Sequence, residues 1–216
     1  YSAMIISAPD SADLLQAASW SVTDSLPYDS TYLDGKFGAW LEGNAVVTPD
    51  GNVADLLRVD YAPGPEYAAL IRLRDSVSFD PFDPEKDFVR MPGGAKKFTV
   101  RYDSLSGRYW SLVNYVTQEW AGKQNPAWVR NTLALSSSPN LQEWTVHRTV
   151  LHHPDIAKHG FQYADWLFDG NDIVLLSRTA YDDNGTGAHN CHDANYMTFH
   201  RIKDFRKALT EQAGNR

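Results

Sequence analysis

The glutamate at position 42 is the residue of this sequence best suited to acid–base chemistry. Glu42 stands between Leu41 and Gly43, so we expect an apolar setting around its carboxyl group. Partial burial raises the pKa of a carboxyl group, and a carboxylic acid that keeps its proton can donate it to the oxygen of a leaving group. The sequence therefore predicts Glu42 as a general acid. The alternative is a structural carboxylate that accepts backbone N–H groups.

Other polar and aromatic side chains gather in a few segments with the composition of a sugar-binding surface. Aromatic faces cover the apolar C–H faces of a sugar ring, while planar polar groups bind its hydroxyls. A glycan is therefore the predicted ligand, although Trp and Tyr can equally fill a β-rich core. The candidate substrate-binding residues are Asn44, Lys97, Arg101, Trp120, Trp128, His159, Gln162, Asp165, Arg178, His189, His192 and Asp193.

Three arginines at predicted strand ends could bind a carboxylate. Arg178, Arg130 and Arg101 each offer a planar, two-pronged donor that matches a carboxylate. Such a clamp would imply an acidic sugar. Arginines in these positions also pair with carboxylates at the edge of a core, and the sequence leaves both interpretations open.

The segment 188–195 contains two His, one Asp and two Asn, a composition that raises the question of a metal. Amide-rich loops more often bind hydroxyls or one another, so we expect no metal ligands and no cofactor. Calcium would be favoured over zinc if an ion did bind, because oxygen donors predominate. The single Cys191 has no partner for a disulfide or a thiolate cluster.

The elements that must position these residues are short strands in a repeated order. Hairpins are predicted at 45–59, 98–114 and 164–178, and each is followed by a loop and a third strand at 67–74, 130–138 and 195–202. The second unit continues through a turn into a fourth strand. This turn, Ser137 to Trp144, has the spacing of a degenerate S-x-D-x-G-x-T-W box, and a related turn occurs within 7–22.

Four-stranded units at this spacing are typical of propeller blades. The predicted fold is all-β, with about three four-stranded blades plus part of another, from the C-terminal part of a five-bladed propeller or, less favoured, a six-bladed one. The predicted divisions are 1–28 as the end of a preceding blade, 29–90 and 91–152 as blades, and 153–216 as the last blade with a C-terminal tail. A β-sandwich is the alternative, but it would not impose second strands that each end in a polar residue.

In a propeller, the first strand of each blade lies nearest the central channel. Its start opens on the same face as the loop between the second and third strands. The first-strand segments are 37–46, 91–100 and 158–166, and the matching loops are 60–66, 114–130 and 178–195. These segments hold most of the candidate residues, whereas the opposite face receives economical Asp-Gly and Ser-Pro turns. One face is therefore predicted to carry the function.

Composition excludes two classes of partner. Hydrophobic residues make up 43% and charged residues 22% of the chain, the balance of a folded domain with a packed core. The net charge is −7 and basic residues form no run, so a nucleic acid is not expected. No stretch approaches the roughly 18 apolar residues of a membrane helix, so no membrane partner is expected.

Several segments together resemble a known family. They are WLEGNAVVTPDG, FVRMPGGAKKFTVRYD, RYWSLVN, RNTLALSSSPNLQEWTVHR, HGFQYADW, SRTAYDD and AHNCHDANYMTFHRI. They resemble segments of bacterial β-propeller glycoside hydrolases, which include sialidase-like proteins and furanosidase-type enzymes (arabinanases, β-xylosidases and invertases). The resemblance implies hydrolysis of O-glycosidic bonds at the propeller centre and a periplasmic or secreted location.

The furanosidase-type pattern has an acidic Glu at the start of an inner strand, followed by Gly or Cys and then Pro. WLEGN resembles this pattern with Asn44 in place of Pro, which implies Glu42 as the proton donor and a second carboxylate upstream of residue 1. A sialidase would instead use an arginine cluster, to which Arg178 and Arg101 could contribute.

Two further alternatives remain open from the sequence. One is a non-catalytic carbohydrate-binding propeller. The other is a scaffold completed by a partner half-propeller or a homo-oligomer, since unpaired strand edges recruit partners.

Overall fold

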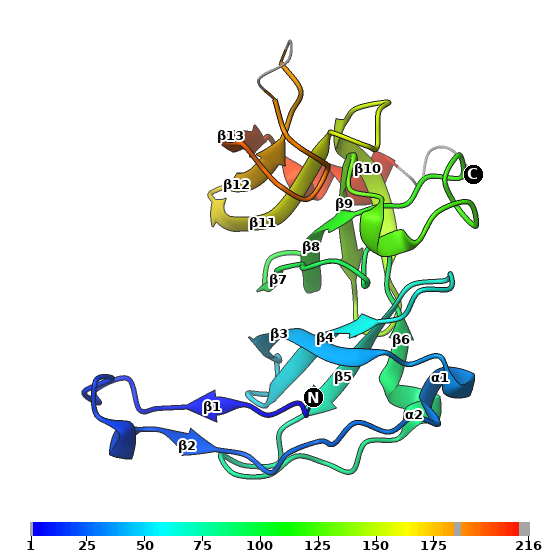
Figure 1. The fold of residues 1–216 in the computed structure, drawn as a ribbon. Helices are drawn as coiled ribbons and strands as arrows, with labels where there is room; N and C mark the ends of the chain where they lie inside the picture. The colour runs from blue at the N-terminus through cyan, green and yellow to red at the C-terminus, as the bar shows by residue number, and fades with distance from the viewer. Residues whose placement is uncertain (1, 184–186, 212–216) are drawn as a thin grey trace.

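The computed structural model describes residues 2–183 and 187–211 and consists mainly of antiparallel sheets stacked in chain order (Figure 1). The first sheet has the order β3 (Ala39–Val47), β4 (Val53–Asp60), β5 (Tyr67–Arg72), β6 (Phe88–Arg90). The second has the order β7 (Val100–Asp103), β8 (Arg108–Asn114), β9 (Thr132–Ser138), β10 (Thr145–His152). The third has the order β11 (Gly160–Asp169), β12 (Asp172–Ala180), β13 (Tyr196–Ile202).

The remaining elements are short. Strands β1 (Ile6–Ser7) and β2 (Ser21–Val22) form a small hairpin sheet near the N-terminus. The helices are α1 (Tyr32–Gly35), α2 (Pro84–Asp87) and α3 (Ala208–Glu211), and 3₁₀ turns occur at Ala17–Ser19, Pro126–Trp128 and Phe205–Lys207. No helix among the residues placed by the structure is both long enough and apolar enough to span a membrane.

The β-propeller prediction is confirmed by this arrangement. In each of the three large sheets, strands that follow one another in sequence are neighbours in the sheet, which is the meander of a propeller blade. The three predicted hairpins occur as the pairs β3–β4, β7–β8 and β11–β12. Within the described part of the chain the third sheet has three strands, one fewer than the four-stranded blades expected from the sequence.

Hairpin turns set the register of the first two strands of each blade. Gly51, Gly107 and Gly170 adopt positive φ values of 83°, 63° and 62° in the turns that join these pairs. Glycine populates this region at no steric cost, because it lacks a Cβ atom. Of the strands that leave these turns, β4 and β8 are buried along most of their length, whereas β12 alternates buried with more exposed residues.

The core consists of layers between successive sheets. Leu56, Leu70, Phe98 and Val113 belong to the layer between the first and second sheets. Trp110, Leu135, Trp166 and Leu175 belong to the layer between the second and third. A third layer covers the remaining face of the first sheet, where Phe37, Trp40 and Phe88 form an aromatic cluster with Tyr32 and Phe82. Each sheet therefore contributes its side chains to the packing of the next.

Two turns share one local design, as their sequences suggested. Asn140 accepts hydrogen bonds from the backbone N–H groups of Gln142 and Glu143, and the Trp144 indole donates to the Leu141 carbonyl at 2.9 Å. In the N-terminal hairpin, Asp13 accepts from the Leu15 N–H, and the Trp20 indole donates to the Leu14 carbonyl at 3.1 Å. In each turn the tryptophan indole therefore satisfies a backbone carbonyl of the turn.

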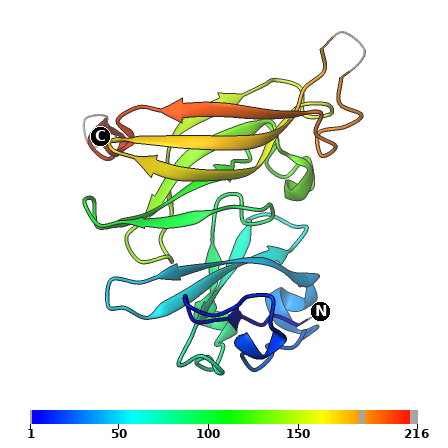
Figure 2. The ribbon, with the colours of Figure 1, turned by 90° about the vertical axis from the view of Figure 1, so that its left-hand side faces the viewer.

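One face of the third sheet is apolar and exposed. Leu167, Leu176, Met197 and Phe199 are 58%, 49%, 66% and 62% exposed, and Leu176 pairs with Phe199 across β12 and β13. This sheet lies at one end of the stack and the N-terminal hairpin lies at the other (Figure 2). The opposite face of the same sheet is buried against the second sheet through Trp166, Ile173 and Leu175.

Candidate active site in the propeller channel

The innermost strands of the three blades form a pocket with a volume of about 330 Å³. Asn44 comes from β3, Lys97 and Thr99 from the segment that leads into β7, Arg101 from β7, and Tyr163 and Asp165 from β11. Four of the predicted site residues, Asn44, Lys97, Arg101 and Asp165, therefore meet at one place. We call this pocket the channel site.

Hydrogen bonds fix the three strands against one another at the channel site. The Asn44 amide accepts from the Val100 N–H at 3.0 Å and donates to the Val100 carbonyl at 3.1 Å, which joins β3 to β7. The Arg101 guanidinium donates to the Trp166 carbonyl at 2.6 Å and to Asp165 at 3.3 Å. Asn44 and Arg101 therefore connect neighbouring blades through hydrogen bonds, and both side chains also line the pocket.

Lys97 is the cationic centre of the channel site. Burial lowers the pKa of Lys97, and the negative charges of Glu42, Asp165 and Asp55 oppose this effect. The ammonium group also donates to the Phe98 carbonyl at 2.8 Å. One lysine therefore interacts electrostatically with three carboxyl groups that come from two different blades.

Glu42 lies in a different environment from the one expected. Its carboxylate pairs with the Arg58 guanidinium at 3.0 Å, and its side chain is 41% exposed. Arg58 is fixed in turn by a 2.9 Å hydrogen bond to the Ala95 carbonyl. The Glu42 carboxylate therefore has a cationic partner on the adjacent strand instead of the apolar surroundings expected from its neighbours in sequence.

The sequence did not single out Asp55, the third carboxyl group. Asp55 is 5% exposed. Burial raises the pKa of its carboxyl group to about 6, against the opposing effects of the Asn44 backbone N–H and the Lys97 charge. A Cβ atom at position 43 would lie 2.4 Å from one carboxylate oxygen of Asp55. A side chain at position 43 would collide with this carboxyl group, so the glycine of β3 allows Asp55 of β4 to pack against it.

Arginines surround Tyr163 at the edge of the channel site. The guanidinium carbons of Arg178 and Arg130 lie 5.1 Å and 5.9 Å from the centre of the Tyr163 ring, within the range of cation–π attraction. Tyr163 adopts a φ of 49° at a bulge of β11 between Gln162 and Asp165. Non-glycine residues rarely adopt this conformation, and it often marks functional sites.

Arg130 and Arg178 are held by neutral groups. Arg130, which is 4% exposed, donates to the Gln162 side chain at 2.7 Å and to the Ala127 carbonyl at 2.9 Å. Arg178 donates to the His192 carbonyl at 2.7 Å. Within residues 2–183 and 187–211 neither arginine forms an ion pair with a carboxylate. Two cations next to the pocket therefore lack a carboxylate partner in the described part of the chain.

The remaining predicted residues lie outside the pocket lining. Gln162 is fully buried and donates to the Cys191 and His192 carbonyls, both at 2.8 Å, so it anchors the 188–195 loop. His192 contacts Trp128, with ring centres 6.3 Å apart. His189 and His192 both lie within ion-pair distance of Asp193, and Trp120 belongs to the loop between β8 and β9. Residues 184–186 of the predicted loop 178–195 lie outside the described residues.

His159 belongs to a separate cluster with His153 and Asp155, whose ligand atoms all lie within 4.8 Å of one another. These groups already bond to one another: His159 contacts Asp155 at 2.8 Å, and His153 accepts from the Asp155 N–H at 3.1 Å. The two imidazole rings stack with centres 3.5 Å apart and planes inclined by 14°. Their in-plane lone pairs therefore lie in nearly parallel planes, which does not suit a shared metal ion.

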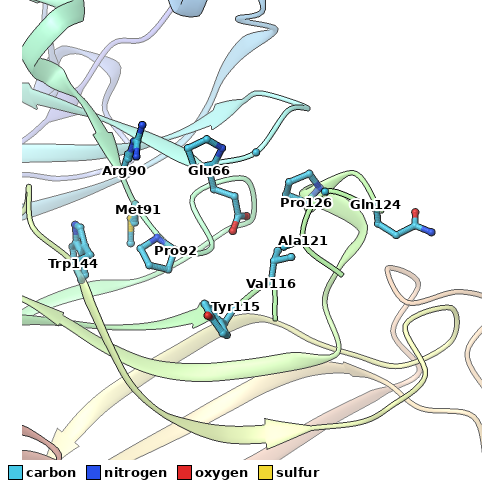
Figure 3. A pocket seen from close by; sticks show the side chains of 13 residues that line it. Glu66, Arg90, Met91, Pro92, Tyr115, Val116, Ala121, Gln124, Pro126 and Trp144 are labelled. Carbon is cyan, nitrogen blue, oxygen red and sulfur yellow. The ribbon is translucent and has the colours of Figure 1, made fainter. Parts of the chain in front are cut away.

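A second, mostly apolar pocket of about 360 Å³ lies between the first two blades (Figure 3). Met91, Pro92, Tyr115 and Trp144 contribute to its lining together with Glu66. Glu66 forms an ion pair with the fully buried Lys96 and accepts from the Gly93 N–H at 2.9 Å. The polar side of this pocket is thus occupied by an internal ion pair that connects the two blades.

Comparisons with known proteins identify the fold. No protein-family model and no curated protein sequence match the chain. Among solved structures, the chain is similar to an α-L-arabinanase of Penicillium chrysogenum complexed with arabinobiose, with a TM-score of 0.50, 11% identity and coverage of 82% of this chain and 49% of that chain. The Bombyx mori GH32 β-fructofuranosidase BmSUC1 gives a TM-score of 0.49 and 14% identity, with 76% and 33% coverage.

An intramolecular trans-sialidase of Ruminococcus gnavus in complex with oseltamivir carboxylate gives a TM-score of 0.48 and 17% identity, with coverage of 87% of this chain and 36% of that chain. The structural neighbours are therefore sialidase-like and furanosidase-type propeller glycoside hydrolases, as the sequence resemblance predicted. The chain spans about half the length of the arabinanase, and its fold is that of a β-propeller.

Proposed function

We propose that the chain contributes to the hydrolysis of O-glycosidic bonds in a glycan bound at the propeller channel. The observation that supports this most is Lys97, which lines the channel site and interacts electrostatically with the carboxyl groups of Glu42, Asp165 and Asp55. Glycosidases use a pair of carboxyl groups that flank the scissile bond. Glycoside hydrolysis therefore fits the chemistry of the channel site as well as the fold. A periplasmic or secreted location belongs to the same proposal.

Glu42 and Asp165 are the two carboxyl groups to which this proposal assigns the chemistry. Each pairs with an arginine, Glu42 with Arg58 at 3.0 Å and Asp165 with Arg101 at 3.3 Å. Carboxylates held in this way can activate a water molecule or attack the anomeric carbon. This assignment gives Glu42 a role other than that of proton donor, and it supplies a second carboxylate from residues of this chain.

The test compares hydrolysis with binding. The intact protein is assayed on a panel of aryl glycosides that includes sialosides and arabinofuranosides, next to the variants Glu42→Gln and Asp165→Asn. The expected result is a loss of at least about 100-fold in kcat/KM for each variant, with sugar affinity retained. Glu143→Gln, which changes an exposed glutamate of the β9–β10 turn, is the matched control.

A non-catalytic carbohydrate-binding propeller is the competing function. It predicts sugar binding with no turnover by the unaltered protein, and little change of affinity in Glu42→Gln. Binding without hydrolysis across the whole panel would therefore contradict the hydrolase proposal and favour the binding protein.

A specific observation favours an anionic sugar as the substrate. Arg130 and Arg178 flank Tyr163 without a carboxylate partner in the part of the chain that the structure describes. Arg130 is buried and Arg178 is partly buried; a buried charge without a counter-charge is costly, and a ligand carboxylate would supply one. We therefore expect Arg178→Ala to raise KM for acidic glycosides by 10-fold or more and to leave KM for neutral glycosides nearly unchanged. Equal effects on both classes would refute the preference.

A further inference from the structure

The large sheets of the chain form an arc with two free ends. Hydrogen bonds join the inner strands β3, β7 and β11 to one another, whereas the outer strands β6 and β10 lie on the far side of the stack (Figure 1). A propeller closes around its channel with about 4–8 blades. The described part of the chain supplies three large sheets and the small N-terminal sheet, so each end of the arc presents a face that no sheet within this part covers.

One free end is the outward side of the third sheet. Leu176 pairs with Phe199 across β12 and β13, and Val174 pairs with Leu167 across β11 and β12. Residues paired in register, and residues two apart on one strand, point to the same side of a sheet. The exposed side chains of Leu167, Leu176, Phe199 and Met197 therefore form one continuous apolar surface. Such a surface marks a site of association between proteins.

The other free end is the N-terminal hairpin formed by β1 and β2. One side of this hairpin packs on the first sheet, where Ala3 and Leu26 belong to its core layer. Ile6 and Val22 pair in register across the two strands and are both exposed, and Met4 is exposed as well. The second end of the arc therefore also presents paired apolar side chains on a sheet face.

A second copy of the chain supplies what a closed ring needs. The chain covers 49% of the arabinanase with 82% of its own residues, so two copies together amount to about one such propeller. Charge decides how the ends meet. Residues 2–28 contain three exposed aspartates and no lysine or arginine, so two hairpins repel each other. The favourable partner of each hairpin is the third sheet of the other copy.

We propose that two copies of the chain close into one ring. The outward side of the third sheet of each copy packs on the N-terminal hairpin of the other. These two contacts are equivalent under a two-fold axis along the central channel, so association stops at two copies. The inner strands of both copies then line one channel, and the channel site of each copy faces that of the other across the axis.

Sedimentation equilibrium tests this assembly without any glycoside. The expected mass is twice the 24.3 kDa of one chain. Phe199→Glu and Ile6→Glu, one at each end of the arc, should each raise the dissociation constant of the dimer by about 100-fold or more, because each places an unpaired charge in an apolar contact. Both positions are exposed in the single copy, so both variants should fold, which circular dichroism checks. Leu105→Glu, in the exposed β7–β8 turn, is the matched control and should dimerise like the unaltered protein.

Three results would overturn the ring. The first is a monomer across the whole concentration range. The second is a dimer lost in Phe199→Glu and kept in Ile6→Glu, because it would mean that the third sheets pack on each other. The third is a mass that grows beyond two copies with concentration, which would indicate open chains. A dimer that hydrolyses no glycoside would support the ring and overturn the hydrolase function alone.

Discussion

Replacing Asp55 by Asn should make the folded protein more stable at neutral pH. Burial raises the pKa of Asp55 from 3.8 to about 6, so the fold prefers the protonated carboxyl group. Between these two values the native state binds more protons than the unfolded chain, and stability therefore falls as the pH rises from about 4 to about 6. A pKa difference of about 2.2, at 1.36 kcal/mol for each pKa unit, corresponds to a cost of about 3 kcal/mol above pH 6.

An Asn side chain has nearly the same shape and no charge, and its carbonyl can still accept from the Asn44 N–H. Asp55→Asn should therefore recover up to about 3 kcal/mol at pH 7.5 and nothing at pH 3.5. Urea unfolding followed by tryptophan fluorescence at pH 3.5, 5, 6 and 7.5 would measure this difference. Two stability curves that run parallel across this range would refute the reasoning, because they would mean that Asp55 titrates alike in the folded and unfolded chains.

Three further substitutions test the packing that supports the site. Lys96→Met should lower the free energy of unfolding by about 3–5 kcal/mol, because it leaves the buried Glu66 without its cation. Adding Glu66→Leu should restore most of this loss, and no recovery in the double variant would contradict the ion-pair argument. Trp110→Ala should cost about 3–5 kcal/mol in chemical denaturation, since Trp110 is fully buried between the second and third sheets. Gly94→Ala should lower the melting temperature by several degrees, because its Cβ would lie 2.4 Å from the Tyr67 carbonyl oxygen, and an unchanged melting temperature would show that this contact relaxes freely.

The fold could be predicted because a propeller repeats its signals. Each blade contains a hairpin with a glycine turn followed by a loop and a third strand, so evidence that is weak in one unit recurs in the next. The predicted hairpins at 45–59, 98–114 and 164–178 match β3–β4, β7–β8 and β11–β12. The convergence of Asn44, Lys97, Arg101 and Asp165 on one pocket followed from placing the inner strands at the channel.

Single side chains were harder to predict, because alternate residues of a strand face opposite ways. The neighbours of Glu42 in sequence, Leu41 and Gly43, suggested an apolar setting. Its actual partner is Arg58 on the adjacent strand, which depends on cross-strand register. Asp55 was missed for the same reason. The one signal that could have indicated it was Gly43, since a glycine inside a strand often marks the close approach of another group.

His159 shows the effect of local loop geometry. Its place at the start of an inner strand predicted a sugar contact. In the structure Asp155, four residues earlier, holds the imidazole at 2.8 Å, and His153 stacks on it. Hydrogen bonds between residues so close in sequence form readily in a loop, and the other ring nitrogen of His159 accepts from the Asp182 N–H at 3.2 Å, so both nitrogens have partners within the protein.

The left-handed backbone of Tyr163 sets a conformational cost against the contacts of its ring with Arg130 and Arg178. A φ of 49° is unfavourable for tyrosine. It costs glycine almost no free energy and costs asparagine less than tyrosine. A laboratory evolution experiment that selects only for heat resistance should accept Gly at this position, and one that selects for sugar turnover should keep the aromatic ring between the two arginines. The two selections would thus diverge at a single codon, and that divergence would show whether the ring serves the substrate or the fold.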